Sequence, residues 1–119
     1  MNKWLTLTNL PANAIRDLML DADQGATNMR FVGEPSTVTF AINATAALGV
    51  EYEVYSGGRR VIERSTVEGG AVAGTFPNLD QKGQSFAAAG GDILEFKVRE
   101  TLGVATTDIN FVISVEPGV

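Results

Sequence analysis

Short segments in which apolar and polar residues alternate follow one another along this chain. The clearest lie at residues 37–43 (TVTFAIN), 50–54 (VEYEV), 94–99 (LEFKVR) and 109–115 (INFVISV). Alternation sends successive side chains to opposite faces, which is the period of a half-buried β-strand. Because glycine-rich turns separate these segments, the pattern predicts an all-β fold, an antiparallel β-sandwich or barrel.

The turns predict how some strands pair. Residues 50–55 and 60–66 flank the sequence Ser56-Gly57-Gly58-Arg59 and are expected to form a hairpin, because paired glycines supply the positive φ angles of a tight turn. Residues 94–99 and 108–115 are expected to form the last pair of strands. Further strands are expected at residues 3–8, 29–32, 36–43 and 84–87.

Two stretches are less regular. Residues 12–23 carry Ile15, Leu18 and Met19 at helical spacing, although alternate residues there also fit a strand, and we favour the extended interpretation. Residues 68–91 are rich in Gly, Ala and Ser and are expected to be mostly a connection around one short strand. A connection of this length in a compact domain usually has a purpose, often contact with a partner.

Composition narrows the function. The 119 residues fit a single domain, residues 1–119, and the chain has neither cysteine nor histidine, which excludes disulfides, thiolate catalysis and cysteine-bound zinc. Nine basic against fourteen acidic residues give a net charge of -5, and only Arg59 and Arg60 are adjacent basic residues, so direct nucleic-acid binding is not expected. Since no secretory signal or membrane span is evident, we expect a soluble protein made in the cytoplasm, without cofactor or small-molecule substrate.

One acidic motif could bind a cation. Asp21 and Asp23 alternate before Gly25, as in the start of a calcium-binding loop. An EF-hand would need its glycine one place later and a glutamate where Val32 stands. We therefore expect a solvated turn and no metal site.

A second acidic group could in principle support glycoside hydrolysis. Glu51 and Glu53 lie on one face of a predicted strand, with Glu63 on its partner, and hydrolysis of this kind uses two carboxyl groups. Nothing in the surrounding sequence would bury one of them, and alternation directs them to solvent, so we expect a charged outer face and no enzyme. The cross-strand partners are expected among Arg60, Arg64, Lys97 and Arg99.

Aromatic residues are the best candidates for partner contact. Tyr52 is in phase with Val50 and Val54 and is expected in the core, whereas Trp4 and Tyr55 are free to stack on a ligand or a neighbouring subunit. The candidate partner-contact residues are Trp4, Tyr55, Arg59, Arg60, Phe76 and Phe86.

Five phrases occur in order along the chain: LTNLPANA (7–14), VTFAI (38–42), VYSG (54–57), GGDILEFKVR (90–99) and VISVEP (112–117). Together with the strand at 60–66, this series resembles small β-sandwich virion proteins of bacterial viruses, both single jelly-roll capsid subunits and decoration proteins. The resemblance spans most of the chain through strand-and-turn phrases. It implies a jelly-roll-like sandwich in a virion that is assembled in the host cytoplasm, with copies of itself and other capsid proteins as partners.

The expected function is therefore that of a non-enzymatic, self-associating capsid or capsid-decoration protein. The lack of a basic arm favours a place on the outer shell, where sheet edges, the connection at 68–91 and both termini would contact neighbours around a symmetry axis. A carbohydrate-binding or adhesion module is the alternative. It needs an exposed aromatic platform, for which only Trp4 and Tyr55 are available.

Overall fold

Eight β-strands and two single-turn helices make up the described part of the chain. The computed structural model describes residues 2–23, 29–46, 49–72, 74–103 and 107–118. None of the helices in these ranges is long and apolar enough to cross a membrane. The elements are β1 (Asn2–Leu10), β2 (Ile15–Asp17), α1 (Leu18–Asp21), β3 (Ser36–Ala44), β4 (Val50–Ser56), β5 (Arg59–Thr66), α2 (Leu79–Lys82), β6 (Gln84–Ala88), β7 (Leu94–Glu100) and β8 (Thr107–Pro117).

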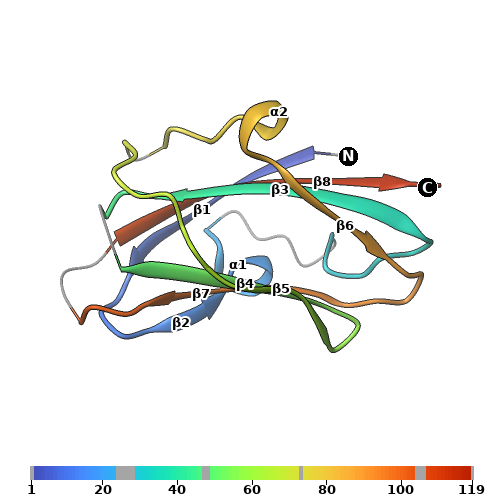
Figure 1. Cartoon of the computed structure of the whole chain (residues 1–119), viewed down its shortest axis with the longest axis horizontal. Coiled ribbons are helices and arrows are strands. Elements are labelled where there is room, and N and C mark those ends of the chain that lie inside the picture. Colours follow the sequence, from blue (N-terminus) through green and yellow to red (C-terminus); the bar gives the residue numbers. More distant parts are fainter. Residues whose placement is uncertain (1, 24–28, 47–48, 73, 104–106, 119) are drawn as a thin grey trace.

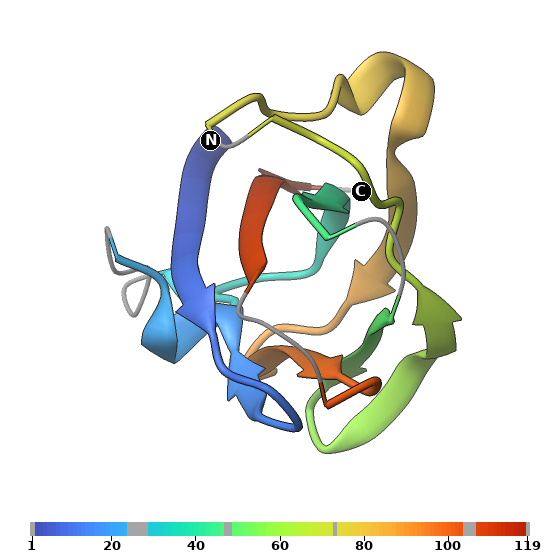
Figure 2. The same cartoon turned by 90° about the vertical axis from the view of Figure 1, so that its left-hand side faces the viewer.

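The strands form two four-stranded antiparallel sheets packed face to face (Figure 1). The upper sheet of Figure 1 has the order β1-β8-β3-β6, and the lower sheet has the order β2-β7-β4-β5. The first strand therefore pairs with the eighth, the second with the seventh, the third with the sixth and the fourth with the fifth. This is the arrangement of an eight-stranded jelly roll. The predicted antiparallel β-sandwich is confirmed, and Figure 2 shows its two layers from one end.

The core lies between the sheets and follows from the alternation. Phe40 on β3, Phe96 on β7 and Phe111 on β8 meet at its centre, with ring centroids 4.9 to 6.3 Å apart. All three rings are buried. The ring of Tyr52 packs edge-on against Phe40 at 5.8 Å, which confirms the prediction that Tyr52 belongs to the core. Aromatic contacts of this kind join the two layers directly.

The hairpin of β4 and β5 is confirmed. Ser56 pairs with Arg59, and the two residues between them, Gly57 and Gly58, have φ angles of 61° and 82°. Only glycine adopts such angles without a steric cost, so this pair of residues determines where the chain reverses.

Two predictions about strands are wrong. The last two strands do not pair with each other, because β7 lies between β2 and β4 whereas β8 lies between β1 and β3. Residues 29–32 are not a strand: only Phe31 forms a bridge, to Ile93, and backbone hydrogen bonds fasten the segment to the turn between β6 and β7. Alternation tells which face a side chain occupies, but it carries no information about which strand lies alongside.

Residues 12–23 contain both of the conformations that the sequence allowed. The strand β2 is three residues long and ends at Asp17, whose side chain caps α1 by accepting a hydrogen bond of 3.0 Å from the N–H of Met19. The extended interpretation is therefore correct only for the first part of the segment. An aspartate in this position satisfies backbone groups that a helix start leaves free, which favours a turn of helix here.

The connection between β5 and β6 crosses the outer face of the upper sheet, above β3 in Figure 1. We call its residues 68–72 and 74–78 the strap. Backbone hydrogen bonds join Ala44 N–H to the Glu68 carbonyl and Ala71 N–H to the Ala44 carbonyl. The helix α2 follows the strap, and then comes β6, which confirms the short strand that was predicted at 84–87.

Candidate functional site

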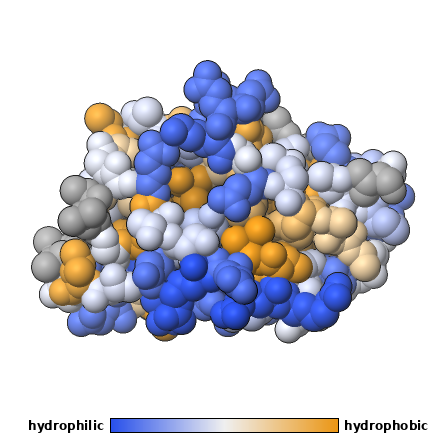
Figure 3. All heavy atoms as spheres, in the orientation of Figure 1, coloured by the Kyte–Doolittle hydropathy of each residue, from blue (hydrophilic) through white to orange (hydrophobic). Residues whose placement is uncertain are grey.

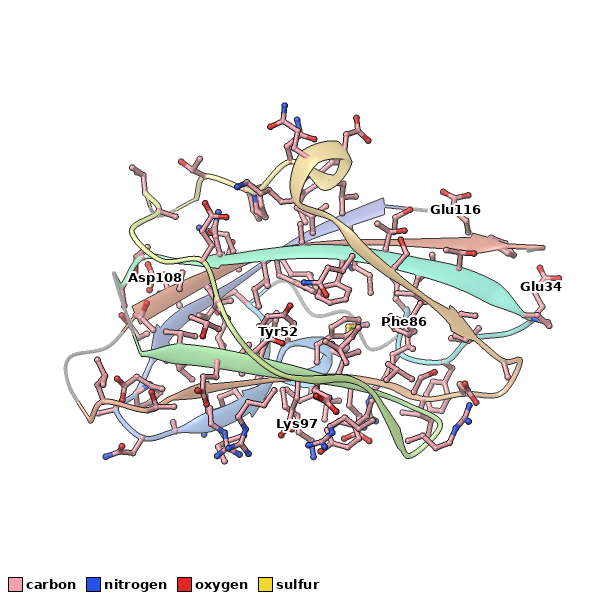
Figure 4. The ribbon with its side chains drawn as sticks, in the orientation of Figure 1. Glu34, Tyr52, Phe86, Lys97, Asp108 and Glu116 are labelled. Carbon is pink, nitrogen blue, oxygen red and sulfur yellow. The ribbon has the colours of Figure 1, made fainter. Side chains whose placement is uncertain are left out.

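A groove of about 600 Å³ opens at the end of the sandwich where both chain termini lie (Figure 1). Its floor is formed where β3 begins and β8 ends, and its wall is the segment that leads into β3. Figure 4 places Glu34 and Glu116 at this end. The lining residues are Met29, Phe31, Val32, Gly33, Glu34, Ser36, Val115 and Pro117.

The wall of the groove is fixed by the turn between β6 and β7. Val32 N–H donates to the Asp92 carbonyl at 2.9 Å, Gly91 N–H donates to the Val32 carbonyl, and Leu94 N–H donates to the Arg30 carbonyl. These bonds hold Phe31 with 61% of its surface exposed. Because most of the lining is apolar, the groove is suited to apolar side chains of a partner rather than to acid-base chemistry.

The carboxylates of the lower sheet are ion-paired on its outer face. Glu53 lies between Arg60 at 3.6 Å and Arg99 at 4.0 Å, and Glu51 lies 4.0 Å from Arg64. The predicted cross-strand pairing is thus confirmed for the three arginines, whereas Lys97 pairs with a residue of its own strand, Glu95. Glu53 is only 7% exposed, which corrects the prediction that it points into solvent: two arginines flank its carboxylate.

The acidic motif near α1 braces the backbone. The Asp21 carboxylate accepts a hydrogen bond from Asp17 N–H at 3.0 Å. The Asp23 carboxylate accepts from the N–H and the hydroxyl of Thr8. Gln24 to Asn28, the residues that follow in the proposed calcium loop, lie outside the described residues. Within the described ranges, no group of three or more potential ligands could hold a metal ion.

Two further carboxylates hold turns in place. Burial raises the pKa of Asp17, although N–H groups of Met19 and Phe96 donate to its side chain. A hydrogen bond from the Ser56 hydroxyl, together with one from Ala89 N–H, lowers the pKa of Asp92. Each of these carboxylates accepts hydrogen bonds from two different segments, which is the role of a structural acceptor.

The aromatic candidates for stacking do not share a surface. Trp4, 53% exposed, projects from the outer side of β1 in the upper sheet, on the face opposite the core residues Leu5 and Leu7. Tyr55 lies on the outer side of the lower sheet, with the Lys97 ammonium 4.9 Å from its ring centroid. The two rings are therefore on opposite sides of the molecule, and the paired platform that sugar binding would need is not formed.

The other predicted contact residues are dispersed. Arg59 is exposed at the hairpin tip, and Arg60 is used by Glu53. Phe76 is half-buried within the strap. Phe86 is also half-buried, and its ring lies 6.3 Å from Phe40, so most of it belongs to the core (Figure 4).

Sequence reasoning missed the polar contact that holds the strap. Asn110 on β8 donates to Asn43 Oδ1 at 2.8 Å and accepts from Gly74 N–H at 3.2 Å, while Asn43 donates to the Thr75 carbonyl at 3.1 Å. Both asparagines are buried although they face away from the core. The outward residues of this part of β8 are Asn110, Val112 and Ser114, so the one apolar side chain among them, Val112, is the only weak sign in the segment that its outer face is covered.

No protein-family model matches the chain, and a search of curated proteins finds no similar sequence. Support for a function therefore comes from the residues described above and from their arrangement.

Proposed function

We propose that this chain is a non-enzymatic structural protein of a bacteriophage particle, which associates with copies of itself and with other capsid proteins as a capsid or decoration subunit. The strand order supports the proposal, because two-sheet jelly rolls of eight strands are used in viral capsids as well as in lectins and cupins. A fold alone does not define a function, so the surface has to distinguish these uses.

The observation that carries the proposal is the uncovered apolar groove at the end of a well-packed sandwich. Phe31 is largely exposed, whereas its neighbours Met29 and Val32 are buried in the same core as the rest of the molecule. Apolar surface of this kind marks an interaction site, and a neighbouring subunit would remove it from water. A lectin-like role has less support, since Trp4 and Tyr55 lie on opposite layers.

Light scattering coupled to size exclusion, followed by electron microscopy of early-eluting material, tests this proposal. Closed shells would indicate a coat subunit, and discrete trimers or pentamers would indicate a decoration or vertex protein. Phe31→Ser is expected to reduce assembly without lowering the melting temperature. Val72→Ser is the matched control, because Val72 is 72% exposed on the strap, away from the groove. A wild-type monomer at all concentrations would overturn the proposal.

A further inference from the structure

Four strands lie at the edges of the two sheets: β1 and β6 in the upper sheet, β2 and β5 in the lower. An edge strand offers unpaired backbone N–H and C=O groups to any other extended chain. Natural proteins block this pairing with charges, proline, bulges, very short strands or a covering segment. The edges of this protein differ in whether they carry such a device.

Three of the edges are protected. The strand β5 carries four charged residues in eight and has irregular register with β4. The strand β2 is three residues long and turns directly into α1. The strand β1 carries the charged residue Lys3, and Asp23 covers its second half, since the Asp23 N–H donates to the Thr6 carbonyl at 2.8 Å and its carboxylate accepts from Thr8.

The remaining edge, β6, has none of these protections. The chain from Gly83 to Gly91 contains no charged residue and no proline. Its pairing with β3 is regular over all five residues, from Gln84 opposite Phe40 to Ala88 opposite Ser36. In the described part of the chain, the backbone of β6 has hydrogen-bond partners only on its β3 side. It is therefore a template for pairing with another strand.

Apolar side chains lie beside this edge. Phe86, Val61 and Ile62 are half-buried and pack on the rim of the core where β6 and β5 face each other. Figure 3 shows white to orange side chains on this side of the molecule, with a blue, hydrophilic border below them along the lower sheet. An added strand at β6 would cover part of this apolar rim as well as satisfying backbone groups.

We propose that β6 is the site at which two copies of this chain join, by antiparallel pairing of the two β6 strands across a twofold axis near Phe86. This arrangement places Ser85 of each copy opposite Ala87 of the other. It brings no charge opposite a like charge, although the chain carries a net charge of -5. An identical uncharged edge on each copy is self-complementary, as a twofold interface requires. The inference rests on the proposed self-association and names the strand that mediates it.

The test introduces the protection that β6 lacks. Ala87 is exposed on the outer face, so Ala87→Lys is compatible with the fold, and Ala12→Lys makes the same charge change in an exposed loop far from β6. In the Phe31→Ser background, which removes the groove contact, light scattering should give the mass of two chains, with or without Ala12→Lys. For Ala87→Lys the dissociation constant of the dimer should rise about tenfold or more, because a twofold interface contains the substituted residue of both copies. Ala87→Ser should behave as the wild type.

Hydrogen exchange gives a second readout, which locates the contact within the folded protein. Raising the protein concentration should slow exchange of those wild-type amides between Ser85 and Ala88 whose N–H groups point away from β3, and this slowing should vanish in Ala87→Lys. A wild-type oligomer that Ala87→Lys leaves unchanged would overturn the β6 interface and leave the structural role standing. A wild-type monomer at all concentrations would overturn both, so the two failures can be told apart.

Discussion

Asn110→Ala tests how the strap is held. The substitution removes a side chain that is fully buried and that bonds both to the sheet and to the strap. It leaves one buried group, the Asn43 Oδ1, without its partner, and it removes the acceptor of the N–H of Gly74, a residue that is itself exposed. We therefore expect the variant to be less stable and its strap to open more readily.

The magnitude follows from the count of orphaned groups. A buried donor or acceptor that loses its partner costs about 1–3 kcal/mol, so the loss of the partner of Asn43 Oδ1 predicts a decrease of about 1–3 kcal/mol in the free energy of unfolding. Asn43→Ala should cost a similar amount, since it orphans Asn110. The loss in the free energy of unfolding for the double variant should be smaller than the sum of the two single losses by about 1 kcal/mol or more, because the two side chains bond to each other.

Urea unfolding at pH 7 measures the change, and hydrogen exchange locates it. The amides of Gly70 and Ala71, which bond to the β3 side of the sheet, should exchange faster in Asn110→Ala, whereas that of Phe111 in the core should be protected until global unfolding. Ser85→Ala is the control, since it removes an exposed hydroxyl contact on the same outer face and should cost less than about 0.5 kcal/mol. A loss below about 0.5 kcal/mol for Asn110→Ala would refute the reasoning.

Four further predictions concern the core, a buried carboxylate and the pH dependence of stability. Phe40→Ala should lower the free energy of unfolding by about 3–5 kcal/mol in urea, against less than about 0.5 kcal/mol for Val72→Ala, because only Phe40 is buried. Glu100→Gln should lower the free energy of unfolding by about 1–3 kcal/mol, as measured by differential scanning calorimetry. The two oxygens of the buried Glu100 carboxylate accept three backbone N–H bonds, and an amide has only one oxygen to accept them. Asp17→Asn should stabilise the protein at pH 7 but not at pH 3, because a raised pKa penalises the folded state only once the unfolded carboxyl ionises, above 3.8. Asp92→Asn should destabilise the protein at pH 7 but not at low pH. The lowered pKa of Asp92 stabilises the folded state above pH 3.8, and this stability is lost as the pH falls further, so the free energy of unfolding of the variant should depend less on pH in the acid range.

The strands were predictable where one face meets the core and the other meets water. Residues 37–43 and 94–99 alternate cleanly, and the Gly57-Gly58 turn specifies its own hairpin. Strand partners were not predictable in the same way, because the order of strands depends on how all eight pack together. The sequence placed β7 beside β8, whereas each lies in the middle of a different sheet.

The candidate site was harder to predict, because the burial of its residues depends on segments that are distant in the sequence. Asn110 reads as a polar, outward residue, and only the fold shows that the strap lies on it. Glu53 likewise became buried through arginines from two other strands. The groove at Phe31 depends on where β8 and β3 end relative to their neighbours. None of these features has a local period, so they follow from tertiary packing rather than from the pattern of any one segment.

The two outer faces of the sandwich are both occupied, and this favours lateral contacts in any assembly. The strap covers the part of the upper sheet around Asn43 and Asn110, and paired charges whose desolvation would be costly cover the lower sheet. The edge at β6 and the groove at Phe31 are uncovered, whereas Trp4 is a single exposed aromatic side chain on the outer face of β1. Contacts at an edge and an end join copies side by side, in the plane of a layer, and leave both faces outward. A subunit of a shell needs this distribution, and it is the reason that the β6 and Phe31 substitutions, rather than changes on either face, are the decisive ones.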